Sequence, residues 1–121
     1  MSDPVETLRA FGAAIERGEP AVATDLFAPD ATYEEPPAPI LHGRVALLTF
    51  FADFAARHSD VSFTISRAFA DADNTLVAAE WRFAYTRTLD GARRVYEGIS
   101  ILDFTADGRI ASWRGFSALL G

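Results

Sequence analysis

The chain has 121 residues, half of them hydrophobic, with no cysteine and a formal net charge of −6. These values suit one domain over residues 1–121, with a core that needs no disulfide or structural metal. The missing cysteines exclude disulfides, thiolate catalysis and Cys-based zinc sites, and the acidic balance argues against a nucleic-acid partner.

Neither a targeting signal nor a membrane span is expected. Residues 1–12 lack the cationic and long apolar segments of a secretory signal peptide, and no apolar run approaches membrane-spanning length. We therefore expect a cytoplasmic protein with no membrane partner.

The N-terminal residues predict two helices. Asp3 can cap the first helix, Pro4 suits its first position, and Gly18 suits its end. A short second helix is expected to start at Pro20 and to stop at residues 28–30, where an Ala-Pro-Asp sequence is typical of a helix end.

A short strand is expected over residues 31–35, before a proline-rich loop at 36–39. Gly43 precedes a third helix with one apolar face, and residues 58–60 close it.

The second half of the chain predicts four strands. Apolar and polar residues alternate over 61–66, and longer strands are expected over 76–87, 93–104 and 109–119. Helices early and antiparallel strands late predict an α+β fold of order α-α-β-α-β-β-β-β. We expect three N-terminal helices to cover the concave face of a curved antiparallel sheet and to enclose an apolar pocket.

The turn at residues 90–91 decides which strand residues face the helices. A two-residue turn there gives an aromatic-rich inner face, with Trp81 opposite Ser100, Phe83 opposite Gly98 and Tyr85 opposite Tyr96. The outer face then carries isoleucines among charges, namely Glu80, Arg82, Glu97, Ile99, Ile101 and Asp103. A longer turn would reverse the assignment.

Three segments carry a resemblance to a known superfamily. The runs LFAPDATYEEP (26–36), HGR (42–44) and DGRI (107–110) resemble the nuclear transport factor 2-like superfamily, and within it the SnoaL-like and ketosteroid-isomerase-like proteins. The resemblance implies a cone-shaped α+β barrel and a homodimer formed through the outer sheet face. It leaves the activity open, because this fold hosts isomerases, polyketide cyclases, epoxide hydrolases, dehydratases and non-enzymatic binding modules.

The ketosteroid isomerase pattern is only partly kept. By that resemblance, Glu35 stands at the place of the general base. The oxyanion-hole tyrosine falls on Phe11, the supporting tyrosines on Phe51 and Phe27, and the protonated aspartic acid on Ser100. Loss of one oxyanion donor typically costs about 10²–10³ in rate. We therefore do not expect a true steroid isomerase.

Four residues are candidates for catalysis. Glu35 would be the base, with Tyr85, Tyr96 or Ser100 as polar partners. An alternative reading makes Glu34 and Glu35 two solvated acids on an edge strand, and the tyrosines ordinary core residues.

The apolar pocket is expected to bind a small hydrophobic molecule. Its candidate lining residues are Phe11, Ile15, Phe27, Tyr33, Phe51, Phe54, Trp81, Phe83, Trp113 and Ser117. For the two tryptophans, plain core packing is the competing interpretation. The two histidines lack metal-ligand spacing and no phosphate or dinucleotide motif is present, so neither metal nor cofactor is expected.

Two hypotheses of function remain. The first is a cofactor-independent enzyme, an isomerase, cyclase-like lyase or hydrolase, acting on a hydrophobic cyclic or polyketide-like carbonyl compound. The second is a non-catalytic module for ligand binding or dimerisation. The first requires the Glu35 carboxylate to point into the pocket, and the second expects it in solvent.

Overall fold

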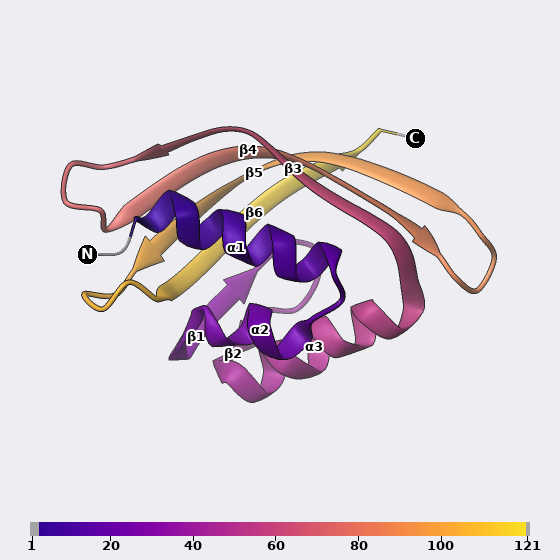
Figure 1. Cartoon of the computed structure of the whole chain (residues 1–121), viewed down its shortest axis with the longest axis horizontal. Coiled ribbons are helices and arrows are strands. Elements are labelled where there is room, and N and C mark those ends of the chain that lie inside the picture. The colour runs from indigo at the N-terminus through magenta and orange to yellow at the C-terminus, as the bar shows by residue number, and fades with distance from the viewer. Residues whose placement is uncertain (1–2, 121) are drawn as a thin grey trace.

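The structure, a computed structural model, describes residues 3–120. Three helices lie beneath a long, curved sheet (Figure 1). The helices are α1 (Pro4–Glu16), α2 (Pro20–Asp25) and α3 (Gly43–Arg57). The strands are β1 (Phe27–Glu34), β2 (Leu41–His42), β3 (His58–Ala70), β4 (Leu76–Arg87), β5 (Arg93–Phe104) and β6 (Ile110–Leu119). The predicted α+β fold, with three helices covering the concave face of a curved sheet, is confirmed. The sheet itself is open and mixed, where the prediction made it wholly antiparallel and part of a cone-shaped barrel.

The sheet has the strand order β2-β1-β6-β5-β4-β3. All neighbouring pairs are antiparallel except β1 and β6, which run parallel, so the sheet is mixed. Two strands far apart in the sequence can pair in either direction because no hairpin joins them. This parallel pair brings Tyr33 opposite Trp113.

The first helix starts as its sequence predicts. The Asp3 carboxylate accepts a hydrogen bond of 2.9 Å from the backbone N–H of Val5, and Pro4 occupies the first helical position. Gly18, just beyond the helix, has a φ of +66°, a conformation that glycine adopts without strain. The second helix starts at Pro20, also as predicted.

Two strand starts differ from the prediction. Strand β1 begins at Phe27 and runs through residues 28–30, where the prediction placed only a helix stop, and its pairing with β6 is irregular between Phe27 and Thr32. Strand β3 begins at His58 directly after α3, with a bulge between Ser59 and Ser62. In both places an irregular register accommodates residues whose composition is typical of a turn.

The β4–β5 hairpin differs from the prediction in its register, but its residues lie on the predicted faces of the sheet. Trp81 pairs with Gly98 and not with Ser100, because the connection between the strands spans residues 88–92 and is longer than a two-residue turn. The pairing is displaced by two residues. Since side chains alternate with period two, an even displacement leaves every residue on its predicted face. The inner face is therefore the aromatic one.

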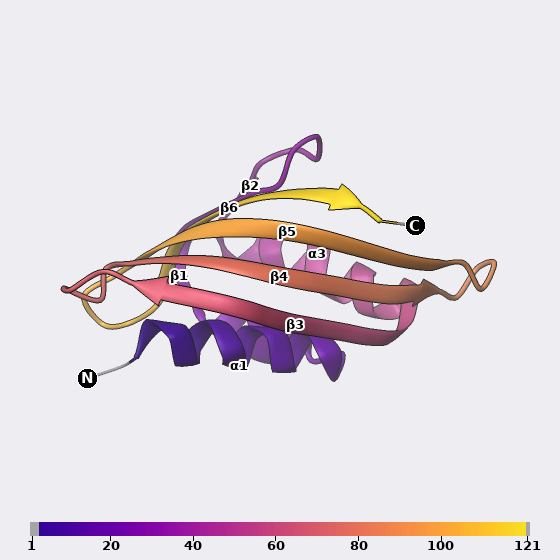
Figure 2. The same cartoon turned by 90° about the horizontal axis from the view of Figure 1, so that it is seen from above.

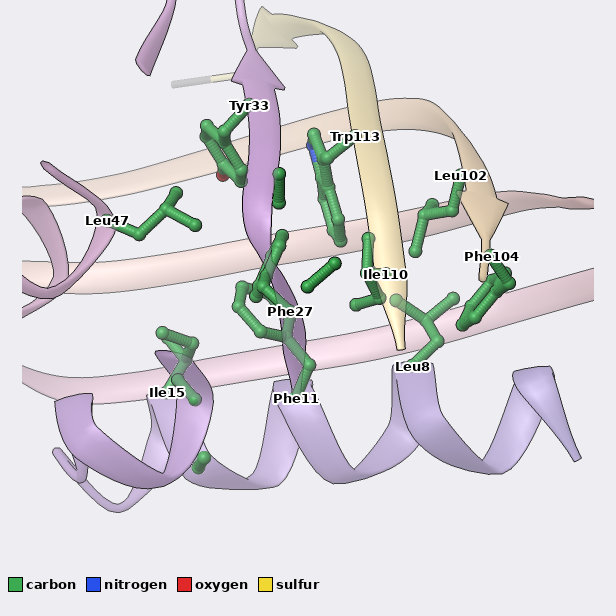
Figure 3. Close-up of a cluster of buried hydrophobic side chains, with 14 of the residues drawn as sticks. Leu8, Phe11, Ile15, Phe27, Tyr33, Leu47, Leu102, Phe104, Ile110 and Trp113 are labelled. Atoms are coloured by element: carbon green, nitrogen blue, oxygen red, sulfur yellow. The ribbon is translucent and has the colours of Figure 1, made fainter. Parts of the chain in front are cut away.

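The core lies between α1, α3 and the inner face of the sheet. Figure 2 shows α1 lying along β3, and Figure 3 shows side chains from helices and strands meeting between the layers. Leu8, Leu47 and Leu102 are fully buried.

The outer face of the sheet mixes apolar and charged side chains, as predicted. Exposed apolar residues alternate there with the ion pairs Arg67–Glu80 and Arg82–Glu97. The apolar members are Phe69, Ile99, Ile101 and Phe116. Within residues 3–120, no helix has the length and apolar character needed to cross a bilayer.

Candidate functional site

A cavity of about 90 Å³ opens between α1, α3 and the inner face of the sheet. The predicted residues that line it are Phe11, Ile15, Tyr33, Glu35, Phe51, Phe54, Trp81, Phe83 and Trp113. Two further rings, Phe50 and Phe63, also line it and were not among the candidates. Phe50 is 41% exposed, which places it at the mouth.

Glu35 follows the last residue of β1 and is half-buried. Its Oε1 accepts a hydrogen bond of 3.0 Å from the indole Nε1 of Trp113 and one of 3.3 Å from the hydroxyl of Tyr33. The Tyr33 and Trp113 rings stack with centroids 5.4 Å apart, side by side on β1 and β6 (Figure 3). The parallel pairing of these strands therefore fixes both donors against one carboxylate oxygen.

A glycine makes room for this arrangement. A Cβ atom at Gly115 would lie 2.7 Å from Glu35 Oε1 and 2.9 Å from Trp113 Nε1, closer than any side chain tolerates. Gly115 was not among the predicted site residues. A glycine inside a strand often marks a close approach of another group, and this was the available signal.

The environment raises the basicity of the carboxylate. Burial raises the pKa of Glu35 above its ordinary value, and the hydrogen bonds from Trp113 and Tyr33 oppose this effect. Burial, followed by the charge of Glu35, raises the pKa of Tyr33 well above its ordinary value. Tyr33 therefore keeps its proton and remains a hydrogen-bond donor to Glu35.

Ser100, a candidate polar partner, does not line the cavity. It is buried, and its Oγ accepts a hydrogen bond of 2.8 Å from the indole Nε1 of Trp81. This bond satisfies an indole group that would otherwise be buried without a partner.

Tyr85 and Tyr96 lie together outside the cavity lining. Their hydroxyls are 3.5 Å apart, and the Tyr85 ring contacts the rings of His58 and Phe54. Burial and the bond to Tyr96 raise the pKa of Tyr85 to about 12. The two hydroxyls thus meet each other and not Glu35.

The last two candidates also lie outside the lining. Phe27 is fully buried in the core, where its ring packs against Phe11. Ser117 is exposed near the end of β6, beside a separate open hollow. Among residues 3–120, no group of three His, Cys, Asp or Glu side chains could hold a metal ion.

Comparison with known proteins gives one family, one relative by sequence and several solved structures of similar fold. Residues 8–113 match the SnoaL-like domain. The Steroid Delta-isomerase of Nocardioides simplex is 34% identical over 108 residues, which are 87% of this chain and 81% of that protein.

Solved structures share the fold at lower identity. The epoxide hydrolase/cyclase-like enzyme SalBIII, of pyran ring formation in polyether salinomycin, superposes with a TM-score of 0.84 at 21% identity, over 95% of this chain and 90% of that one. An LEH-like epoxide hydrolase of M. tuberculosis gives a TM-score of 0.82 at 20% identity, over 96% and 83%. The match to the family covers most of the chain, and the protein belongs to the SnoaL-like domain family.

Proposed function

We propose that this protein is a cofactor-independent acid–base catalyst that moves a proton within a small apolar carbonyl compound, with Glu35 as the base. One observation carries the proposal. The Glu35 carboxylate lies at an apolar cavity, held by Trp113 and Tyr33 and with a raised pKa. A base held in fixed geometry with a pKa moved toward neutral pH is what proton abstraction from carbon requires.

The reaction follows from the arrangement of the two side chains. Glu35 takes a proton from the carbon next to the carbonyl group and returns it to a second carbon of the same molecule. The negative charge that develops on the carbonyl oxygen needs a hydrogen-bond donor. Tyr33 is the polar partner that we propose, because among residues 3–120 it is the tyrosine that lines the cavity. Its hydroxyl donates to the Glu35 carboxylate at rest and is free to turn to the carbonyl oxygen once Glu35 has taken the proton. The Tyr85, Tyr96 and Ser100 hydroxyls meet other partners.

The relatives support this class of reaction. The Steroid Delta-isomerase to which the chain is similar is named for the shift of a double bond, which is a proton transfer. The cavity of about 90 Å³ is smaller than the about 300–1,000 Å³ of pockets that hold drug-sized ligands. We therefore propose a substrate smaller than a steroid, of the cyclic or polyketide-like kind.

A small cyclic β,γ-unsaturated ketone tests the proposal directly. The conjugated product absorbs ultraviolet light, so isomerisation can be followed continuously. We expect turnover by the native protein, and Glu35→Gln to lower the rate by about 10²–10⁴, the usual contribution of a general base. A steroid of the same β,γ-unsaturated type should react more slowly than the small ketone.

Glu34→Gln is the matched control. Glu34 is the neighbouring carboxylate and lies near Arg114, with 3.9 Å between the charged atoms, and does not line the cavity. Its removal should leave the rate unchanged. Equal rates for native protein and Glu35→Gln would favour the second candidate function, a non-catalytic pocket for hydrophobic ligands.

We also propose a homodimer formed through the outer sheet face. Phe69, Ile99, Ile101 and Phe116 expose apolar surface there. The ion pairs that alternate with them would add polar contacts to that interface.

A further inference from the structure

The cavity surrounds its single carboxylate with aromatic rings from several elements. Phe11 comes from α1, Phe54 from α3, Phe63 from β3 and Trp81 from β4, and all line the same space as Glu35. The face of an aromatic ring carries partial negative charge and attracts cations within about 6 Å of its centre. Both the rings and the carboxylate therefore favour positive charge.

The hydrogen-bond donors of the lining side chains are already engaged. Tyr33 and Trp113 donate to Glu35 Oε1, and the Trp81 indole donates to Ser100. Both bonds to Glu35 end on the same oxygen, so its Oε2 is the acceptor left for a ligand. A ligand with its own positive charge or N–H group can interact with this acceptor and needs no donor from the lining.

No protein cation balances the carboxylate. The lining contains neither Arg nor His, and within residues 3–120 Glu35 takes part in none of the ion pairs. A half-buried carboxylate without a cation loses hydration that no opposite charge replaces. A cationic ligand would supply that charge.

From this combination we infer that the cavity binds small alkylated ammonium ions, with the alkyl groups against the rings and the nitrogen beside Glu35 Oε2. The cavity of about 90 Å³ limits the ligand to a few heavy atoms. This binding goes beyond the proposed proton transfer and does not depend on it, although the ion would compete with a carbonyl substrate for the same space.

Tetramethylammonium chloride is the probe, and the protein supplies the signal. The chain has two tryptophans, and both line the cavity, so a bound ion should change the tryptophan fluorescence. We expect a saturable change with tetramethylammonium. The neutral tert-butanol has a similar shape and should bind about tenfold or more weakly, and sodium chloride at equal ionic strength should produce no saturable change.

Two variants separate charge recognition from simple filling of an apolar space. Glu35→Gln should weaken binding of tetramethylammonium by about tenfold or more and leave the response to tert-butanol unchanged. Glu34→Gln should bind like the native protein. Equal affinity for the ion and the alcohol, or an unchanged affinity in Glu35→Gln, would overturn the inference. The readout is binding alone, so the result stands whether or not a ketone is turned over.

Discussion

A glutamate on the inner side of the sheet and a glutamate on its outer face have pKa values shifted in opposite directions. On the inner side, burial raises the pKa of Glu35, and its partners are a phenol and an indole. On the outer side, the Arg67 guanidinium holds the pKa of Glu80 below its ordinary value, and both side chains are in solvent. The environment, not the residue type, therefore gives Glu35 its basicity.

Among changes that keep Glu35 itself, the largest effect should come from filling the space beside it. Gly115→Ala would place a Cβ atom 2.7 Å from Glu35 Oε1, so the carboxylate must move outward. We expect the isomerisation rate to fall by about 100-fold, the usual cost of misplacing a catalytic group by about 1 Å. The acid limb of the pH–rate profile should also move to lower pH, because a more solvated Glu35 is less basic.

Ser117→Ala is the control for that change. Ser117 is exposed on the same strand and does not line the cavity. A folded Gly115→Ala protein with the native rate and pH profile would show that the position of Glu35 is not critical.

The outer face can be tested by placing a charge within its apolar surface. Ile101 is 42% exposed, and its cross-strand neighbours are Ala78 and Arg114. Ile101→Asp should weaken dimerisation by about tenfold to 100-fold, because the new carboxylate would lose its hydration within the interface. Sedimentation velocity measures the effect. Val45→Asp, at an 84% exposed position on α3, should leave the dimer intact. A native protein that sediments as a monomer would refute the interface.

The bond between Trp81 and Ser100 should matter for stability and not for turnover. Ser100→Ala leaves the buried Trp81 indole without an acceptor, which costs about 1–3 kcal/mol of unfolding free energy. Denaturant unfolding measures this loss. The turnover number of the folded variant should stay native. A drop of 100-fold would restore Ser100 as the catalytic partner that the sequence suggested.

The smallest effect concerns the stability contributed by Glu35 itself. Because its folded-state pKa lies above the ordinary value of 4.5, the native state holds this proton more tightly than the unfolded chain. The resulting stabilisation is present below the unfolded pKa and is lost as the pH rises through the folded pKa. Glu35→Gln removes this loss and should be more stable than the native protein near neutral pH, by about 0.5–2 kcal/mol. The advantage should vanish in acid. An unfolding free-energy difference that does not change with pH would contradict the raised pKa.

Parts of this arrangement could be predicted because they depend on local patterns. The turn residues that flank 76–87 and 93–104 gave the bounds of β4 and β5, and the face assignment held because the register changed by an even number. The alternation of side chains assigns residues to a face, but it does not determine which inward-facing residues reach the cavity. Ser100 points inward, yet it lies outside the lining because that depends on where the helices sit.

The Trp113 partner of Glu35 could not be predicted in this way. It depends on the parallel pairing of β1 with β6, which no local pattern encodes. The role of Gly115 has the same origin, because its missing Cβ matters only once the two strands lie side by side.

That pairing has a consequence for the order of events in folding. Glu35 and Trp113 are 78 residues apart in the sequence, so their hydrogen bond closes one of the longest loops in the protein. During synthesis, α1 and α3 leave the ribosome long before β6 exists to cover their aromatic faces. The carboxylate therefore gains its Trp113 donor among the last steps of folding, when β6 is in place. A nascent chain that stalls before β6 would lack both this indole and the glycine that makes room for the carboxylate.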